Sequence, residues 1–342
     1  MRIRFAICAS LVALSSVASA QATPQYRVVK TLKVGGEGGW DYLTADAEGR
    51  RLYVSRGSHV MVFDMDLDSL IADIPNTPGV HGVALARRLN RGFTSNGRDS
   101  SITAFDLKTL QPLSVIRITG RNPDAIAYDS ASNRVFAFNG ASANASVIDA
   151  STLQQVGSID LGGKPETGVP DGNGMLYVNI EDKGEVVALD TRSMQVKARY
   201  SLAPCEEPTG MARDKVRGRL IVGCGNSTMA IVDEKTGKLV TTIPVGAGVD
   251  AAGFDPATQL AFTSNGEGSL SVVREEANGT FTKIATVPTQ RGARTMALDA
   301  KTHKIYMSTA EYGPAPTPTA DRPRPRPPVI PGSFTVLVLD RK

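Results

Sequence analysis

The sequence contains few residues of the types that hold redox cofactors and transition metals. It has one tryptophan, three cysteines and three histidines in 342 residues. A single tryptophan cannot form a recurring tryptophan docking motif for a quinone, and no Cys-x-x-Cys-His segment is present to attach a haem. The histidines do not cluster as zinc ligands do, and no Gly-x-Ser-x-Gly nucleophile elbow is present. These absences argue against a quinone, haem or zinc centre and against a serine hydrolase of that type.

The chain also lacks a strong charge of either sign and a long apolar run. Lysine and arginine total 38, aspartate and glutamate total 34, and the formal net charge is +4 at pH 7. This balance gives no support from bulk charge for a polyanionic partner. A membrane-spanning helix needs about 20 consecutive apolar residues, and no segment after the first twenty residues approaches that length. We therefore expect no membrane span.

The first twenty residues have the pattern of a secretory signal peptide. Arg2 and Arg4 precede an apolar stretch over residues 5–14, and Ala18-Ser19-Ala20 is a small-x-small cleavage site. We expect cleavage after Ala20. The expected location of the remaining chain is periplasmic or secreted.

Cleavage would change both the charge and the number of thiols. Removing Arg2 and Arg4 from 38 basic residues leaves 36 against 34 acidic ones, a net charge of +2. Removing Cys8 leaves Cys205 and Cys224. An even pair of cysteines in an exported protein predicts one disulfide, and the alternative is two separate buried thiols.

One unit of about 41 residues is repeated seven times between Tyr42 and the C-terminus. Each copy has a strand, a Gly/Asn/Ser-rich turn and an apolar run that ends in Asp, except in the sixth copy, where Arg274 takes that place. The aligned strands are Arg51–Ser55, Arg91–Ser95, Arg134–Phe138, Met175–Asn179, Arg219–Gly223, Leu260–Ser264 and Lys304–Ser308. A period near 40 made of four short strands is typical of a β-propeller. We predict an all-β, seven-bladed β-propeller with four antiparallel strands per blade, in one domain over residues 21–342.

The two ends of the repeat array complement each other. The last repeat lacks its outer strand, because the chain ends at Asp340-Arg341-Lys342, whereas a spare strand pattern is found over Tyr26–Val34. If this strand completes the seventh sheet, the ring closes and no long strand edge stays exposed. We predict that the N-terminal strand completes the last blade.

The predicted strand path decides which loops share a rim of the ring. Loops that enter the inner strands lie on the same rim as the turns between second and third strands, so Cys205 and Cys224 should meet there in the fifth blade. The opposite rim should carry the turns after the inner strands. Those turns contain Asp in six blades, and we expect these residues to have structural roles in the turns: Asp46, Asp129, Asp171, Asp214, Asp255 and Asp299.

The seventh repeat carries a Pro/Arg-rich insertion at about residues 311–332. This segment holds eight of the 20 prolines, with Arg322, Arg324 and Arg326 between them. Such a composition favours extended, polyproline-like conformers rather than a paired strand. The insertion is either a disordered loop or a lid or partner-docking arm, and it should emerge on the same rim as the disulfide.

Several segments of the repeats resemble one family. They are Leu52-Tyr53-Val54-Ser55, Leu176-Tyr177-Val178-Asn179, Gly162-Gly163-Lys164-Pro165 and Val147-Ile148-Asp149 followed by Ser151-Thr152. Over roughly residues 26–342 the chain resembles the YVTN-type (YncE-like) exported β-propellers. The resemblance implies seven blades and a periplasmic address. It implies little about function, because similar propellers serve as binding platforms, protein partners and, in distant relatives, enzymes.

Superposition of the seven repeats shows charged side chains where the inner strands begin, at the mouth of the central channel. In blade order these positions hold Asp41, His81, Asp124, Glu166, Thr209, Asp250 and Arg294. The fold itself needs no charge there, so the mouth is the candidate ligand-binding site. The alternative is a water-filled mouth whose charges are only solvated.

Neighbours in this ring should interact. We expect Arg294 to pair across blades with Asp250 and Asp41, and we expect carboxylate neighbours to raise the pKa of His81. Like-charged neighbours such as Asp124 and Glu166 favour a retained proton or a bound cation.

Two further sets of residues are candidates for ligand contacts. Asn96, Asn139 and Asn265, each followed by Gly, end the second strands of three blades. They are either hydrogen-bond donors to a ligand or turn formers with left-handed backbone. Trp40, directly before Asp41, is either a stacking platform for a ligand or a packed rim residue.

Three functions compete. The first is a non-catalytic binding module that presents its mouth to a small ligand, a peptide or a protein partner. The second is a metal-assisted lyase or hydrolase with His81 as acid or base. Its Ca²⁺ or Mg²⁺ ligands would come from oxygen donors, namely Asp41, Asp124, Glu166 and Asp250. The third is nucleic-acid binding through Arg87, Arg88 and Arg91, which the strand path places on the rim opposite the insertion. No cofactor is firmly implied.

Overall fold

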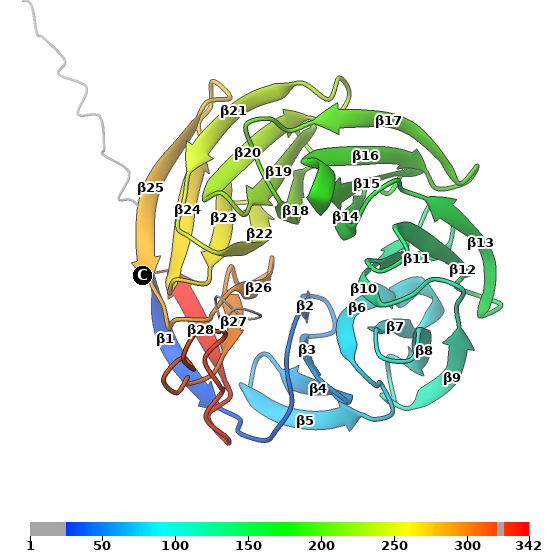
Figure 1. Ribbon diagram of the computed structural model, residues 1–342, viewed down its shortest axis with the longest axis horizontal. Helices are drawn as coiled ribbons and strands as arrows, with labels where there is room; N and C mark the ends of the chain where they lie inside the picture. The colour runs from blue at the N-terminus through cyan, green and yellow to red at the C-terminus, as the bar shows by residue number, and fades with distance from the viewer. Residues whose placement is uncertain (1–24, 320–324, 342) are drawn as a thin grey trace, which may run out of the picture.

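Seven four-stranded β-sheets stand around a central axis like the blades of a propeller (Figure 1). The structure, a computed structural model, describes residues 25–319 and 325–341. The predicted signal peptide and two of the insertion's arginines, Arg322 and Arg324, lie outside the described residues. The prediction of an all-β, seven-bladed propeller with four antiparallel strands per blade is confirmed.

Each of the first six blades is an antiparallel meander that starts near the axis and moves outward. Blade 1 holds β2 (Leu43–Asp46), β3 (Arg51–Arg56), β4 (His59–Asp64) and β5 (Ser69–Ile74). Blade 2 holds β6 (Val80–Ala86), β7 (Arg91–Asn96), β8 (Ser101–Asp106) and β9 (Pro112–Arg117). Blade 3 holds β10 (Pro123–Asp129), β11 (Arg134–Asn139), β12 (Asn144–Asp149) and β13 (Gln154–Asp160).

Blades 4 to 6 repeat this order. Blade 4 holds β14 (Pro165–Pro170), β15 (Met175–Ile180), β16 (Glu185–Asp190) and β17 (Gln195–Ser201). Blade 5 holds β18 (Pro208–Asp214), β19 (Arg219–Cys224), β20 (Thr228–Asp233) and β21 (Leu239–Pro244). Blade 6 holds β22 (Val249–Asp255), β23 (Leu260–Asn265), β24 (Ser269–Glu275) and β25 (Phe281–Pro288). Two single-turn 3₁₀ helices, η1 (Arg87–Leu89) and η2 (Glu181–Lys183), lie in turns of blades 2 and 4.

The seventh blade joins the two ends of the chain. It consists of β26 (Thr295–Leu298), β27 (Ile305–Thr309), β28 (Thr335–Arg341) and the N-terminal strand β1 (Tyr26–Lys33). β1 runs antiparallel to β28, with Tyr26 opposite Arg341 and Lys33 opposite Thr335, and Figure 1 shows the blue and red strands side by side. The predicted closure of the ring by the N-terminal strand is confirmed.

The core lies between the faces of adjacent blades. The middle strands are covered on both faces by the neighbouring blades. Leu52, Tyr53 and Val54 of β3, whose side chains point alternately to the two faces, are therefore all fully buried. Outer strands alternate instead, with every second residue exposed, as in β17. A side chain at Gly168 would meet the ring of Phe138 at 2.3 Å. Glycine there allows blades 3 and 4 to approach closely.

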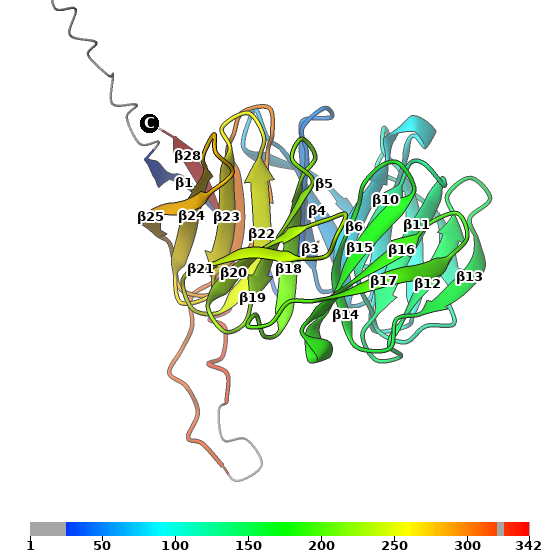
Figure 2. The same cartoon turned by 90° about the horizontal axis from the view of Figure 1, so that it is seen from above.

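The ring has two rims that differ in what they carry. The mouth rim holds the starts of the inner strands, the turns between second and third strands, and the insertion, which projects from one end of the ring in Figure 2. The far rim holds the turns after the inner strands, including η1. The basic cluster that includes Arg87 and Arg88 therefore lies on the rim opposite the insertion, as the strand path predicts.

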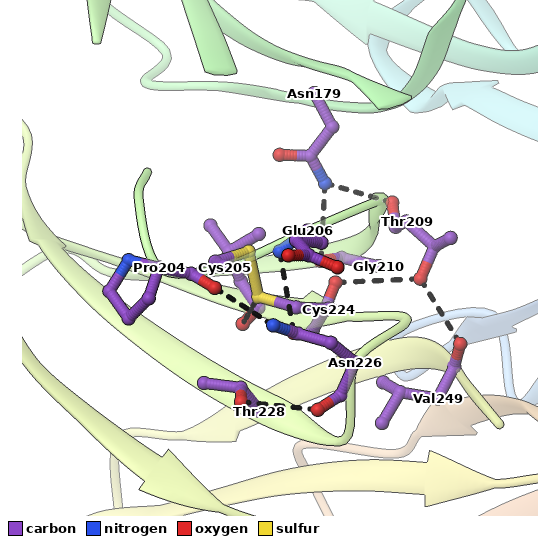
Figure 3. Close-up of a disulfide and its surroundings, with 12 residues drawn as sticks. Asn179, Pro204, Cys205, Glu206, Thr209, Gly210, Cys224, Asn226, Thr228 and Val249 are labelled. Atoms are coloured by element: carbon purple, nitrogen blue, oxygen red, sulfur yellow. Dashed lines mark hydrogen bonds between the residues drawn. A yellow bond between two sulfur atoms is a disulfide. The ribbon is translucent and has the colours of Figure 1, made fainter. Parts of the chain in front are cut away.

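The predicted disulfide is confirmed on the mouth rim of blade 5. Cys205 and Cys224 are bonded, with their Cα atoms 5.6 Å apart (Figure 3). Beside them, the Asn226 side chain donates to the Pro204 carbonyl at 2.8 Å and accepts from the Glu206 amide at 3.3 Å. The disulfide thus links the loop before β18 to the end of β19.

Buried aspartates close the far-rim turns. The side chains of Asp46, Asp129, Asp214, Asp255 and Asp299 are at most 4% exposed. Asp129 accepts hydrogen bonds from the backbone and hydroxyl of Ser132 at 2.9 and 2.7 Å, and from Thr191 of the next blade at 2.6 Å. Arg50 of blade 1 donates to Asp299 of blade 7 at 2.8 Å. These carboxylates have the structural role expected of them, and several also join adjacent blades.

The insertion, hereafter the arm (residues 311–332), has paired limbs at its base. Tyr312 and Val329 form an antiparallel β-bridge. The Gly313 amide donates to Pro328 at 2.8 Å, and the Ile330 amide donates to Glu311 at 2.9 Å. At the base of the arm the two described segments therefore pair with each other as in a β-hairpin.

No helix within the described residues combines the length and the apolar character needed to cross a membrane. The ordered helical structure in that part of the chain consists of η1 and η2, each three residues long.

Candidate functional site

The propeller brings the predicted mouth residues into one ring. His81, Asp124, Glu166 and Asp250 each stand second in their inner strands, β6, β10, β14 and β22. Asp41 and Arg294 lie in the segments leading into β2 and β26. Thr209 of β18 differs from the others, because its hydroxyl donates to the Val249 carbonyl of the next blade at 3.3 Å. The six ionisable members are the chemically active part of the ring.

His81 lies between two carboxylates. Its Nδ1 is 2.6 Å from an Asp41 oxygen and 3.5 Å from an Asp124 oxygen. Burial alone would lower the pKa of His81, but the hydrogen bond that His81 donates to Asp41 and the charges of Asp124 and Asp41 outweigh burial and raise this pKa. His81 therefore tends to hold a proton that Asp41 stabilises.

Three mouth carboxyls retain protons more strongly than usual. Burial is the main cause of the raised pKa of Asp124, about 6, and of Asp250, also about 6, with repulsion from Asp41 adding to both. Burial and repulsion from Asp124 raise the pKa of Glu166 to about 7, against the opposing effect of Lys164. These carboxyls lie close enough to repel one another when ionised, and Arg294 and Lys164 do not fully offset that repulsion.

Arg294 links carboxylates from two blades. Its Nη1 lies 2.5 Å from Asp250 and its Nη2 lies 3.9 Å from Asp41. The pairing expected from the order of the blades is present, with the contact to Asp250 much the shorter. Arg294 is half-exposed and so faces the solvent of the mouth as well.

Two further side chains at the mouth, Tyr42 and Lys164, were not among the residues predicted from the sequence. The Tyr42 hydroxyl donates to Glu166 at 3.3 Å, and its pKa is raised by burial and by the charges of all four mouth aspartates and glutamates. Lys164 lies 2.9 Å from Glu166 and also pairs with Glu181 of η2. Tyr42 directly follows Asp41, and Lys164 stands two residues before Glu166. Sequence proximity to the ring was the available signal in both cases.

The three asparagines lie inside the blades. Asn96, Asn139 and Asn265 are fully buried, and their amide groups donate to side chains of their own sheets. Asn96 donates to Ser101 and Thr103 at 3.0 and 2.9 Å. None of the three is among the described residues with left-handed backbone. Their amide NH2 groups are bonded within the fold and do not donate into the mouth.

Trp40 lies at the edge of the mouth, between blade 1 and the arm. Its ring packs on Phe334 with the centroids 5.2 Å apart, and the residue is only partly buried. It lines a cavity of about 450 Å³ together with Arg294, Tyr312 and Arg326. Trp40 is therefore both a packed rim residue and a wall of a pocket.

A buried arginine fixes the segment before Trp40. Arg56 at the end of β3 is 1% exposed and lies over the Phe334 ring, 4.0 Å from its centroid. It donates to the carbonyls of Gly38 and Gly35 at 2.5 and 3.2 Å. Through these bonds Arg56 positions the glycine-rich loop that carries Trp40 and Asp41.

Part of the mouth has the geometry of a cation site. One ligand atom from each of Asp41, His81 and Asp124 lies within 4.8 Å of the others. Of the four carboxylates predicted as metal ligands, Glu166 and Asp250 lie outside this group. Two carboxylates and one imidazole are donors that divalent cations accept.

The sequence matches no protein-family model and no curated protein. The fold resembles solved propeller structures at low sequence identity. A chain described as Kuenenia stuttgartiensis hydrazine synthase superposes with a TM-score of 0.71 at 16% identity, over 80% of this chain and 94% of its own. A chain of a crystal structure of the mitotic checkpoint complex superposes with a TM-score of 0.73 at 13% identity, over 98% of both chains. These similarities support the β-propeller fold, and the seven blades are shown by the chain's own sheets.

Proposed function

We propose that the protein is an exported, non-catalytic binding module whose channel mouth holds a cationic group of a small ligand, a peptide or a protein partner. The observation that carries the proposal is the convergence of four carboxylates at the mouth. His81 contacts Asp41 and Asp124, Arg294 contacts Asp41 and Asp250, and the Tyr42 hydroxyl donates to Glu166. The exported location rests on the signal-peptide pattern and agrees with the disulfide.

The charge balance at the mouth favours a cation. Against the four carboxylates stand two permanent cations, Arg294 and Lys164, and Lys164 is shared with Glu181. A cationic group placed among these carboxylates would replace the protons that three of them tend to retain. Ionised carboxylates form shorter and stronger hydrogen bonds with an ammonium group than neutral acids do.

The arrangement of side chains at the mouth also favours a binding site over an enzyme active site that works without a metal or cofactor. His81 is held by Asp41 and Asp124. The Ser55 hydroxyl beside them bonds to the Asp41 amide and the Tyr42 carbonyl, so it is engaged with the backbone rather than with His81. The resemblance to YVTN-type propellers, whose members include binding platforms, agrees with this reading.

The proposal predicts selective binding of an organic amine. Calorimetric titration with cadaverine should show saturable binding at about pH 8, and titration with 1-pentanol, which lacks the charge, should show none. D124N should weaken cadaverine binding about tenfold, the loss expected for one charge-assisted contact of about 1.4 kcal/mol. D73N, which removes an exposed carboxylate from outer strand β5, is the matched control and should bind as the parent does. Equal binding of both compounds, or of both variants, would contradict the proposal.

A second candidate function is a metal-assisted lyase or hydrolase. The observation in its favour is the grouping of Asp41, His81 and Asp124, whose donor atoms could hold Ca²⁺ or Mg²⁺. The metal would supply Lewis acidity at the mouth. A raised melting temperature with either ion, reversed by EDTA and absent in H81A, would favour this candidate. An unchanged melting temperature would remove it.

A further inference from the structure

A pocket beside the ring of carboxylates, which shares Arg294 with that ring, lies between the base of the arm and blades 1, 6 and 7. Its volume is about 450 Å³, within the range of small-molecule sites. Among the described residues, its lining includes three arginines, Arg291, Arg294 and Arg326, and no aspartate or glutamate. The pocket is positively charged, whereas the mouth beside it carries the carboxylates.

Two of the three arginines are uncommitted. Arg294 pairs with Asp250. Within residues 25–319 and 325–341, the guanidinium groups of Arg291 and Arg326 have no hydrogen-bond or ion-pair partner. All three arginines line the same cavity beside Tyr312. The guanidinium groups of Arg291 and Arg326 are therefore available to a ligand in that cavity.

Two aromatic side chains, Trp40 and Tyr312, also line the pocket. Gly292 has a φ of +82°, and a Cβ there would lie 2.4 Å from the Tyr312 hydroxyl oxygen, so glycine allows the tyrosine to lie against the backbone. The β-bridge between Tyr312 and Val329 holds the arm in this position.

We propose that this pocket binds a small aromatic carboxylate. Guanidinium groups match a carboxylate in a bidentate geometry, and Trp40 and Tyr312 would pack against the ring of the ligand. This inference goes beyond the function proposed for the mouth, because it uses Arg291, Arg326 and Tyr312, which do not belong to the ring of carboxylates. Failure of cadaverine binding at the mouth would leave it untouched.

The experiment can use the intrinsic fluorescence of the protein, because Trp40 is the only tryptophan in the sequence. Titration with benzoate should change the emission of Trp40 saturably. Benzyl alcohol, which keeps the ring without the charge, and inorganic phosphate, which keeps a charge without the ring, should bind much more weakly. No saturable change with benzoate, or an equal response to phosphate, would overturn the proposal.

Three variants assign the effect to the arginines. R291Q and R326Q should each weaken benzoate binding about tenfold, since each loses one charge-assisted interaction. R88Q removes the same charge from the far rim and should leave the benzoate affinity unchanged. Both pocket arginines are exposed, so the variants should melt at the temperature of the parent protein. Parent-like benzoate affinity in both pocket variants would overturn the assignment.

Discussion

Two inner strands, β10 and β22, carry carboxylates at both ends, and the two ends differ in chemistry. In β10, Asp129 at the far rim is fully buried, and its oxygens accept from Ser132 and Thr191. Five residues earlier in the same strand, Asp124 at the mouth contacts His81 at 3.5 Å, and burial raises its pKa to about 6. One strand thus holds an aspartate with several hydrogen-bond donors, Asp129, and an aspartate whose burial is not offset by such donors, Asp124.

The difference follows from what comes next in the chain. After the far end of an inner strand the chain turns back, so backbone amides and hydroxyls of the turn point at the aspartate. Hydrogen bonds from Thr302 and Arg50 accordingly outweigh burial and lower the pKa of Asp299. At the mouth the chain is only entering the strand, and no such turn supplies donors. Burial without donors raises a carboxyl pKa, whereas burial with donors fixes the fold.

The largest effect that would test this comparison is expected when a carboxylate is removed from each end of β10 in turn. D129A should lower the free energy of unfolding by about 4 kcal/mol, because it removes the shared acceptor of the Ser132 amide, the Ser132 hydroxyl and the buried Thr191 hydroxyl. D124A should change it by less than about 1 kcal/mol. Urea denaturation of the two variants measures both values. Equal losses would show that the mouth aspartate is structural too, and the comparison would fail.

The second test concerns how each rim is held together. Side-chain contacts join blades at both rims, and at the mouth rim of blade 5 a covalent bond between Cys205 and Cys224 also closes a loop. Replacing both cysteines by serine should cost about 3 kcal/mol of unfolding free energy, since the closed loop spans 19 residues. Reduction of the parent protein should give a similar loss in urea denaturation. A loss below about 1 kcal/mol would mean that the loop is held by its hydrogen bonds alone.

The smallest effect is expected from the titration of the mouth. The pKa of Glu166 rises from 4.5 to about 7, and that of Asp250 from 3.8 to about 6, so the folded state binds these protons more tightly than the unfolded state. Their contribution to stability is complete below about pH 4 and is lost as the pH rises through 6 to 7. The full pKa shifts would amount to about 5 kcal/mol between about pH 4.5 and 7.5. Solvent at the open mouth screens these charges, so we expect the parent to lose about 2 kcal/mol relative to the E166Q/D250N variant.

That measurement has a counterpart at the far rim. Asp299 has a lowered pKa, so its contribution to stability is present above about pH 4 and is lost as the pH falls further. Denaturation series over both pH ranges should therefore show opposite slopes, each tied to one end of the inner strands. A parent protein that gains stability relative to E166Q/D250N as the pH rises would reverse the sign and refute the assignment for the mouth.

Some of the site followed directly from the repeat. Aligned positions in a propeller point to the same place in each blade, so the alignment alone predicted that Asp41, His81 and Arg294 would meet. The same alignment suggested Asn96 as a ligand donor, because it could not tell whether a side chain at a strand end faces the channel or its own sheet. In the structure the Asn96 amide bonds to Ser101 and Thr103 of the neighbouring strand.

The sequence by itself determined the architecture: seven copies of a four-stranded unit, a spare N-terminal strand for the last blade, and two cysteines on one rim. Local periodicity and strand count are written in neighbouring residues, so they can be read without coordinates. Only the tertiary structure decided which charges are satisfied and where the arm lies. Tyr42 among the carboxylates and Arg326 beside Trp40 come together through packing between blades, and no spacing in the sequence encodes that distance.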